Sequence, residues 1–257
     1  MIFDVSNLYL ILPSFLTAVV DIMFGMGFGL TMTPILVISG FDPHQIVPAL
    51  LFSSLLGNLI SPFFHHKLKN VDFSLCSQHF KISIVIGGLG VVGSVLGALV
   101  SIGISDFHLG LYIGLLVTAL GLFLLLNRKL KTSFSWHKLV ALGLFGSFNK
   151  GISGNGFGPI ITTGMIFMSV DEKVAVSIQT FSELFVSVAG FLAFVLSGTQ
   201  IAWELAFPLS IGVVMSSPLA AFVVHRFESR KLRVAIAMMT AVLGVATLLR
   251  LWWGSVQ

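Results

Sequence analysis

Uninterrupted apolar runs of about 20 residues recur along the whole chain. Examples are ISIVIGGLGVVGSVLGALVSIGI (82–104) and LGLYIGLLVTALGLFLLL (109–126). A helix of about 20 apolar residues crosses a hydrocarbon core of ~30 Å, so each run is long enough to span a membrane. Only 9% of the residues are charged and the mean hydropathy is +1.03, far from the composition of a soluble globular domain. We therefore predict an all-α polytopic membrane protein.

Charge and cysteine usage narrow the function classes further. The basic residues lie in the loops between apolar runs, so the net charge of +4 indicates membrane topology and not binding to nucleic acid. The single cysteine, Cys76, excludes an internal disulfide and a metal site built from several cysteines. The N-terminal MIFDVSNLYLIL has no basic segment before its apolar residues, which predicts mature sequence. We expect no cofactor and no metal.

A glycine pattern occurs once in each half of the chain, as GMGFG (25–29) and GNGFG (154–158). When the halves are superposed with a shift of 129 residues, further positions match: Thr33 with Thr162, Asp42 with Asp171, Val47 with Val176, and Phe52 and Ser53 with Phe181 and Ser182. Such collinear matches are typical of an internal repeat. We predict two copies of one unit, at 1–126 and 138–257, joined by a basic linker at 127–137.

Both copies are predicted to have the same order of elements: an apolar segment broken by glycines, then three transmembrane helices, making about eight helices in total. The predicted segments are 8–39, 45–63, 79–101 and 107–126 in the first copy, and 139–169, 174–197, 203–224 and 232–252 in the second. The arms of each broken segment hold about 13 to 16 residues, or ~20–24 Å of helix, too short to span alone. Each broken segment is thus either one long crossing or a re-entrant hairpin.

Loops rich in Lys and Arg predict the orientation. They lie at 65–69, 127–138 and 225–233, and the positive-inside rule places all three in the cytoplasm. The stretch between the last two loops holds the second broken segment and two full helices. Two helices return the chain to the side where it started, so both loops can be cytoplasmic only if the broken segment makes no net crossing. This favours re-entrant hairpins in an inverted repeat, with the two glycine turns near the midplane. If loop 225–233 violates the rule, both segments cross and the repeats are parallel.

The glycine turns are the predicted functional site. Broken backbone at membrane depth is tolerated only inside protein or beside a water-filled cavity. The arm after each turn starts with unpaired N–H groups and a positive dipole end, which favour an anion; tight hairpin packing is the alternative role. The predicted substrate-binding residues are Gly25, Gly27, Phe28, Gly29, Thr31 and Thr33 in the first copy, and Lys150, Ser153, Gly154, Asn155, Gly156, Phe157, Gly158 and Thr162 in the second.

Three ionisable residues are predicted inside the membrane: Asp21, Lys150 and Glu183. Asp21 and Lys150 occupy equivalent positions, four residues before the first shared glycine of each copy. Charges at such depth are costly and are usually paired or functional. Either Asp21 pairs with Lys150, or Lys150 supplies a positive field for an anionic substrate. Glu183 either carries a coupling proton or keeps Lys150 ionised.

Small polar residues on the helix after each broken segment add candidate lining groups. They are Ser53, Ser54 and Asn58 in the first copy, and Gln179, Thr180 and Ser182 in the second. Hydrogen bonding between helices is the alternative role for these side chains.

An enzyme is not expected. Gly151 to Gly154 match the Gly-x-Ser-Gly of rhomboid-type intramembrane proteases, but a serine nucleophile needs a base at the same depth. All seven histidines are predicted in loops or at helix ends, and the first copy has Phe24 where Ser153 stands. No Gly-Lys-Ser/Thr follows the glycines, which excludes a nucleotide loop.

Two other functions compete with anion transport. A metal site would need ligands such as His65, His66 and His79, but we interpret these as interfacial histidines, since no carboxylate or thiol cluster accompanies them. A cation/proton exchanger built on Asp21 and Glu183 remains the alternative function.

The G-x-G-F-G turn in each half, the polar helix after it and the short NVDF loop (70–73) resemble the TauE/SafE sulfite exporter family of membrane permeases. The resemblance covers nearly the whole chain, and NKGISGNGFGPIITTG (149–164) is its most specific segment. It implies a bacterial or archaeal plasma-membrane transporter without ATPase domains. The implied substrates are small anions such as sulfite, organosulfonates or carboxylates, exported with an ion gradient of protons or sodium. We therefore expect a secondary transporter working by alternating access in the lipid bilayer, with its oligomeric state open.

Overall fold

The computed structural model describes residues 5–25, 28–39, 41, 43–101, 106–126, 132–153, 157–198 and 200–254. These residues form ten α-helices, one short 3-10 helix and no strand, which confirms the all-α class. By length and composition, five helical segments of this part of the chain could cross a membrane: Asn7–Phe24, Gln45–Lys67, Gln78–Gly97, Glu172–Leu196 and Trp203–Arg226.

Each glycine-broken segment consists of two helices. The first half contains η1 (Val5–Leu10), α1 (Ile11–Phe24), α2 (Phe28–Ile38), α3 (Pro43–Lys67), α4 (Gln78–Ser101) and α5 (Asp106–Leu126). The second half contains α6 (Trp136–Ser153), α7 (Phe157–Phe167), α8 (Glu172–Leu196), α9 (Trp203–Arg226) and α10 (Ser229–Gly254). The broken segments are thus α1–α2 and α6–α7, and the six predicted long helices are α3, α4, α5, α8, α9 and α10.

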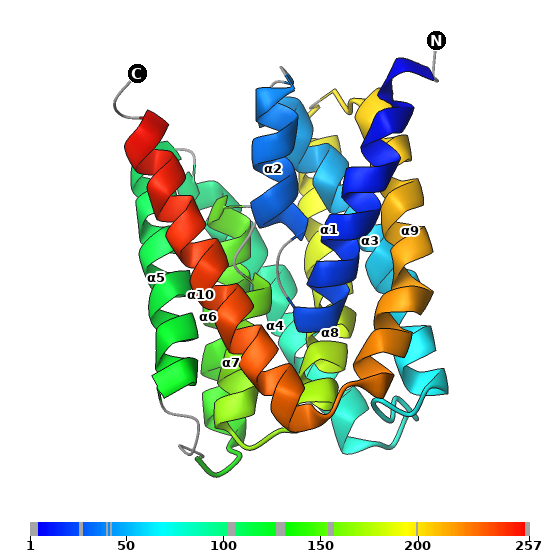
Figure 1. The fold of residues 1–257 in the computed structure, drawn as a ribbon, viewed down its shortest axis with the longest axis vertical. Coiled ribbons are helices and arrows are strands. Elements are labelled where there is room, and N and C mark those ends of the chain that lie inside the picture. The colour runs from blue at the N-terminus through cyan, green and yellow to red at the C-terminus, as the bar shows by residue number, and fades with distance from the viewer. Residues whose placement is uncertain are drawn as a thin grey trace.

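Both broken segments fold back inside the molecule. Figure 1 shows α1 running down from the upper end, where both termini lie, and α2 returning to that end, whereas α6 and α7 form a hairpin from the lower end. Thr132, before α6, donates its backbone N–H to the Phe167 carbonyl at the end of α7 (2.7 Å), so the two ends of this hairpin are adjacent. Leu10 and Phe41, at the two ends of α1–α2, lie in one apolar cluster. That the halves are inverted copies of each other remains a prediction.

The helices break at the glycines. Gly25 ends α1 with φ 71°, and its N–H bonds the Asp21 carbonyl at 2.7 Å. This left-handed conformation carries little cost for glycine and ends many helices. In the second half, α6 ends at Ser153 and α7 begins at Phe157, on either side of the other glycine turn. The sequence pattern therefore located both breaks.

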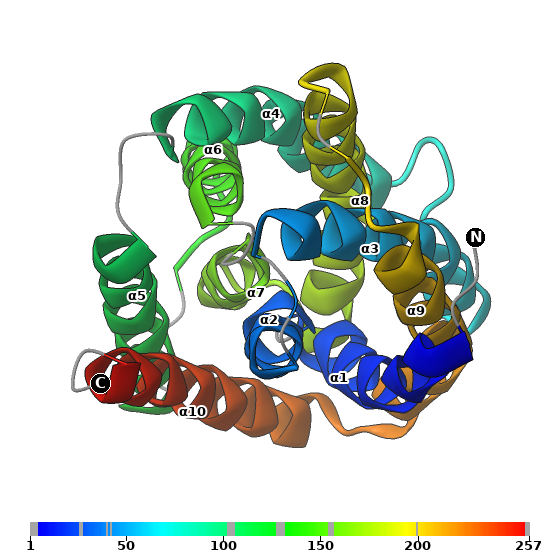
Figure 2. The ribbon, with the colours of Figure 1, turned by 90° about the horizontal axis from the view of Figure 1, so that it is seen from above.

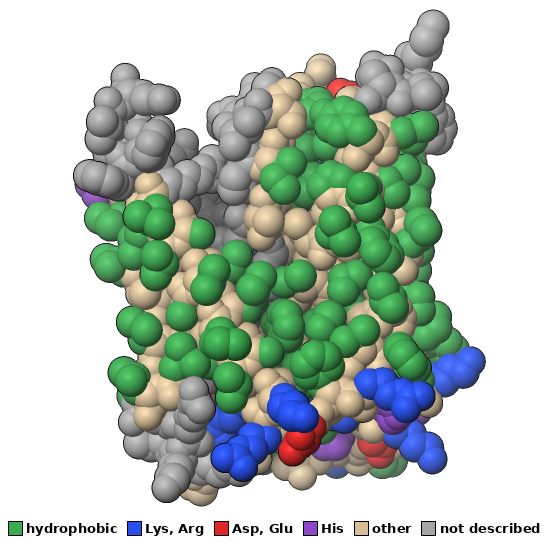
Figure 3. Space-filling view, viewed as in Figure 1, with side chains coloured by type: hydrophobic (Ala, Val, Ile, Leu, Met, Phe, Trp, Pro, Cys, Tyr) green, Lys and Arg blue, Asp and Glu red, His purple; other side chains and the backbone are tan. Residues whose placement is uncertain are grey.

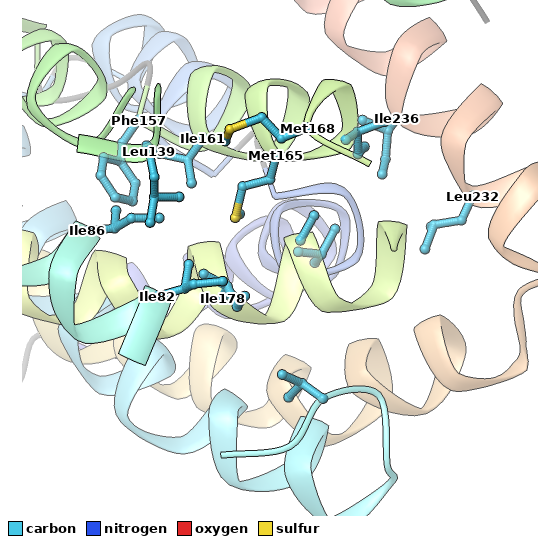
Figure 4. Packing of buried hydrophobic residues seen from close by; sticks show 14 of the residues in the cluster. Ile82, Ile86, Leu139, Phe157, Ile161, Met165, Met168, Ile178, Leu232 and Ile236 are labelled. Atoms are coloured by element: carbon cyan, nitrogen blue, oxygen red, sulfur yellow. The ribbon is translucent and has the colours of Figure 1, made fainter. Parts of the chain in front are cut away.

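The two short returning helices lie in the middle of the bundle. Figure 2 shows α2 and α7 surrounded by the longer helices, among which α4 packs on α6, α5 on α10, and α9 on α1 and α3. Around α7, buried side chains such as Phe157, Ile161 and Met165 contact Ile86 and Leu139 (Figure 4). A second apolar cluster joins side chains of α1, α2, α3 and α9 and includes Met32, Leu36, Leu205 and Leu209. The returning helices α2 and α7 are therefore held in the protein interior.

The surface is divided in the way a membrane protein requires. Figure 3 shows hydrophobic side chains over the middle of the visible face and Lys and Arg gathered at the lower end. Exposed apolar residues such as Leu59, Phe63, Leu192 and Leu196 lie on α3 and α8, the long helices of the candidate spans. An apolar belt of this kind matches a lipid environment.

Close helix contacts depend on particular glycines, and Gly151 makes the closest contact to a neighbouring backbone. A Cβ on Gly151 would lie 2.1 Å from the Ser94 carbonyl oxygen of α4, whereas a Cβ on Gly88 would meet no atom within 4 Å. We expect Gly151→Ala to lower the free energy of unfolding by about 1–3 kcal/mol through overpacking. Gly88→Ala should be neutral or stabilising by up to about 1 kcal/mol, because alanine favours helix.

Thermal unfolding in detergent, followed by tryptophan fluorescence, compares the two variants. Gly88→Ala is the matched control because both glycines lie within helices of the α4–α6 pair. Equal melting temperatures for the two variants would show that α4 and α6 are not in contact at Gly151.

Candidate functional site

A buried ion pair joins α6 to α8. Lys150 Nζ donates to Glu183 Oε1, and the two side chains are only 6% and 11% exposed. Gln179, one turn earlier on α8, donates its Nε2 to Glu183 Oε2 at 2.7 Å. Both carboxylate oxygens therefore have a donor. Glu183 is thus the hydrogen-bonded partner of Lys150, and its two predicted roles, keeping Lys150 ionised or carrying a coupling proton, remain predictions.

Asp21 is the third charge at this place, but it is bonded differently. The side chain is half-buried on α1, and its carboxylate accepts a hydrogen bond from the Phe28 backbone N–H at the start of α2. The first N–H groups of a helix lack an intrahelical acceptor, so Asp21 satisfies one of them. The charges of Glu183 and Lys150 both act on its carboxylate. The hydrogen-bonded partner of Lys150 is Glu183, whereas Asp21 caps α2.

The first glycine turn lies directly against the second hairpin. A Cβ on Gly25 would be 2.2 Å from Thr162 Oγ1 of α7 and 3.2 Å from Gln179 Oε1 of α8. The Thr162 side chain is fully buried, and its hydroxyl has no hydrogen-bond partner in the described part of the chain. A buried hydroxyl without a partner is unusual and often marks the position of a water or a ligand.

The structure thus brings together side chains from both halves of the chain. The predicted site residues that meet here are Asp21, Gly25 and Phe28 of the first hairpin, Lys150 and Thr162 of the second, and Gln179 and Glu183 of α8. Phe157 and Gly158 are buried at the start of α7. Ser153 is the last residue of α6. Gly29, Thr31 and Thr33 are half-buried in the first turns of α2. Gly27, Gly154, Asn155 and Gly156 lie outside the described residues.

The polar residues predicted to line the site take different roles. Ser53 donates to the Ala49 carbonyl at 2.6 Å, facing α9, and Ser182 donates to the Ile178 and Ser83 carbonyls at the α4 contact. Thr180 donates to the Val176 carbonyl at 3.0 Å. Ser54 is half-buried, and the buried Asn58 Nδ2 has no partner among the described residues. Ser53 and Ser182 therefore serve helix packing in this structure.

One buried polar group was missed by the sequence analysis. His65 lies at a helix end as predicted, but its interpretation as interfacial was wrong, because the side chain is fully buried. Its Nδ1 is 2.9 Å from Ser177 Oγ of α8 and 3.2 Å from Asn70 Nδ2, which also donates to the Ala221 carbonyl of α9 at 2.9 Å. The available signal was the NVDF loop, whose asparagine follows His65 by five residues.

The chain is similar to a known family of membrane proteins over nearly its whole length. A family model described as "Sulfite exporter TauE/SafE" matches residues 10–247. The "Probable membrane transporter protein YtnM" of Bacillus subtilis (strain 168) is 24% identical over 250 aligned residues, which cover 92% of this chain and 81% of that protein. The "Probable membrane transporter protein MJ0441" of Methanocaldococcus jannaschii is 25% identical over 260, which cover 93% and 94%. No solved structure matches the chain significantly.

Proposed function

Because the chain belongs to the TauE/SafE sulfite exporter family of membrane transporters, we propose that it exports a small anion by alternating access. The substrate class is sulfite, an organosulfonate or a related sulfur-containing or carboxylate anion. The observation that carries the proposal is the meeting of Lys150, Thr162 and the start of α2 between the two hairpins. An intramembrane cation, an unpartnered hydroxyl and a helix N-terminus are the groups that bind oxyanions.

The bond between Asp21 and Phe28 supports an anion site. A carboxylate already accepts a hydrogen bond from the first residue of α2. The same backbone donor would suit a carboxylate or sulfonate group of a substrate, because the positive end of the helix dipole favours either anion. Asp21 would have to move aside or lose its charge for a substrate to take this donor.

The charges of the site also favour coupling to a cation. With Asp21, Lys150 and Glu183 all ionised, one positive charge faces two negative ones. An anion entering this group meets net negative charge, and like charges in a dry interior repel strongly. A proton on one carboxylate makes the group neutral and removes the repulsion. We therefore favour a proton as the coupling ion, with sodium as the alternative that the experiment separates.

Flux in proteoliposomes tests the proposal. Sulfite, thiosulfate, sulfoacetate and a dicarboxylate are offered in turn, with an imposed pH gradient or an imposed sodium gradient. We expect one of these anion classes to move, and the pH gradient to accelerate it. If no anion moves but a cation exchanges for protons, the exchanger built on Asp21 and Glu183 replaces the anion transporter.

Orientation can be tested with the native cysteine. Cys76 is exposed in the loop between α3 and α4. Figure 1 shows this loop at the lower end of the molecule, the end where Figure 3 shows Lys and Arg gathered. The positive-inside rule puts this end in the cytoplasm of a cell whose plasma membrane holds the protein. A membrane-impermeant maleimide added to intact cells should therefore leave Cys76 unlabelled until the cells are permeabilised.

A cysteine at Gln200, in a Cys76→Ala background, serves as the opposite marker because Gln200 is exposed between α8 and α9. It should be labelled from outside, whereas Arg230→Cys, at the start of α10, should not. Labelling of Cys76 and Arg230→Cys from opposite sides would contradict re-entrant hairpins and favour parallel repeats, because the second broken segment would then cross the membrane between α5 and α8.

A further inference from the structure

Polar side chains follow one face of α3, the face that packs on α8. Ser54, Asn58, Ser61 and His65 recur at a spacing of three to four residues, which places them on the same side of the helix. His65 contacts Ser177, and Leu51, on this same face, lies 3.3 Å from where a Gly190 Cβ would be. This face of α3 therefore lies against α8 from Leu51 to His65, which is near the end of α3.

The two contacts set the register of the helices. As α3 is followed from His65 back to Leu51, its contact on α8 moves forward from Ser177 to Gly190, so the helices are antiparallel. Because both helices rise by the same 1.5 Å per residue, Ser61 lies level with Thr180 and Asn58 level with Glu183. A polar stripe thus connects the height of the central ion pair with the lower end of the molecule.

This stripe concentrates buried polar atoms that lack partners. Among the described residues, Asn58 Nδ2, Ser61 Oγ, His65 Nε2 and, on α8, Ser187 Oγ have no hydrogen-bond partner. A buried polar atom that stays dry and without a partner destabilises the fold. Buried water commonly satisfies groups of this kind. Successive turns of a helix are ~5.4 Å apart, about two hydrogen-bond lengths, so one water between neighbouring groups has the right size.

The Asn70 amide favours one tautomer of His65. Asn70 Nδ2 donates to the Ala221 carbonyl, so the same amide nitrogen faces His65 Nδ1 with its second hydrogen. This favours Nδ1 as an acceptor with the ring hydrogen on Nε2, while Ser177 Oγ, which also faces Nδ1, donates to the Lys173 carbonyl at 2.7 Å. The ring thus directs a donor, without a partner in the described part of the chain, from a fully buried position on the polar face of α3.

We infer that the α3–α8 seam, formed by Asn58, Ser61 and His65 with Ser177 and Thr180, is a hydrated path for the coupling proton between Glu183 and the lower end. The inference rests on the proposed function, because it identifies the route of the ion that accompanies the anion. His65 acts as a relay: the Ser177 hydroxyl gives its proton to Nδ1 while it takes one from a water on the lower side, and the proton on Nε2 leaves to a water beside Ser61. The ring then rotates about its Cβ–Cγ bond, which turns the N–H toward the seam again, so that the next proton moves in the same direction.

The charges at this end suit a relay. Charged and titratable side chains at this end include His66 and Lys67 on α3, Asp72 in the following loop, Asp171, Glu172 and Lys173 at the start of α8, His225 and Arg226 on α9, and Arg230, Lys231 and Arg233 on α10. Lys173 Nζ donates to the His225 carbonyl, Arg233 lies 3.9 Å from Glu172, and Ser74 bonds lower the pKa of the exposed Asp72. His65 Nδ1 faces the Asn70 amide and the Ser177 hydroxyl, and Nε2 has no partner among the described residues. Neither ring nitrogen is therefore bonded to a described carboxylate that would trap a proton on the ring.

The test separates coupling from transport. Proteoliposomes carry an internal pH dye, and the anion is whichever member of the flux panel moves. Wild type should show proton movement together with net anion uptake. His65→Gln should lower proton-driven net uptake about 100-fold, the scale of a lost acid–base group. It should leave anion-for-anion exchange, which needs no net proton, at the wild-type rate.

His137→Gln is the matched control, because His137 is exposed at the start of α6. A merely structural role for His65 would lower exchange and net uptake together, and that result would overturn the inference. Unchanged proton movement and an unchanged pH profile in His65→Gln would also overturn it, while leaving the proposed function intact.

Hydration of the seam is measured without transport, by radiolytic hydroxyl labelling of the wild-type protein in nanodiscs. Side chains of segment 58–65 next to bound water should be oxidised within milliseconds despite their burial. Absence of oxidation there would overturn the path. Absence of anion flux with labelling present would instead count against the proposed function alone.

Discussion

Replacing Lys150 by methionine will lower anion uptake about 100-fold or more, the scale of losing a positioned group that stabilises charge. Lys150 is the cation of the central group, and its side chain is 6% exposed. Methionine keeps much of the side-chain volume and removes only the charge and the donor. The substrate then faces Asp21 and Glu183 without a positive group between the hairpins. Uptake of the transported anion into proteoliposomes is the measurement.

Two controls separate transport from folding. Breaking a buried ion pair costs about 3–5 kcal/mol, because the remaining charge is left without a partner. The double variant Lys150→Met with Glu183→Gln removes both charges and should regain stability without regaining transport. Lys231→Met removes a lysine that is 75% exposed and should behave as wild type. If Lys150→Met transports as fast as Lys231→Met, Lys150 has no role in binding the anion.

Gly25→Ala is expected to reduce both stability and transport. Gly25 has φ 71°, and an alanine methyl would lie 2.2 Å from Thr162 Oγ1. The left-handed backbone costs a residue with a Cβ about 1–2 kcal/mol, and the overpacking about 1–3 kcal/mol more. Because the methyl forces the first turn away from α7, the two halves of the site separate. Thermal unfolding and anion uptake should both fall.

Gly198→Ala isolates the backbone contribution. Gly198 has φ 78°, and a Cβ there would meet no atom within 4 Å. This variant should lose only the stability due to backbone strain and should keep transport. Equal effects of the two substitutions would show that the contact between Gly25 and Thr162 has no functional weight.

Much of the fold could be predicted because its signals are local. A run of about 20 apolar residues predicts a span without knowledge of its neighbours, and the long helices were found in this way. Glycines allow a helix to end, so GMGFG and GNGFG located both breaks. Re-entry could be deduced only indirectly from the charge of loops, and the bond between Thr132 and Phe167 is what places the ends of α6–α7 together.

Pairing inside the bundle could not be predicted in the same way. Position in the repeat suggested Asp21 as the partner of Lys150, but hydrogen bonding depends on the rotation and tilt of helices. In the structure Glu183 lies opposite Lys150, while the Asp21 carboxylate meets the N–H of Phe28 seven residues later. His65 was misjudged for a related reason, since a helix end is usually exposed, whereas this one is covered by α8, α9 and the NVDF loop.

Anomalous diffraction at the selenium edge tests the central claim most directly. Selenite has the charge and shape of a sulfur oxyanion, and selenium gives a signal that identifies its position without interpretation of weak density. In crystals of the wild-type protein soaked with selenite, we predict a selenium peak between the hairpins, in contact with Thr162 and near Lys150. A peak bound only elsewhere, or none at a concentration that competes with uptake of the transported anion, would contradict a substrate site at the two glycine turns.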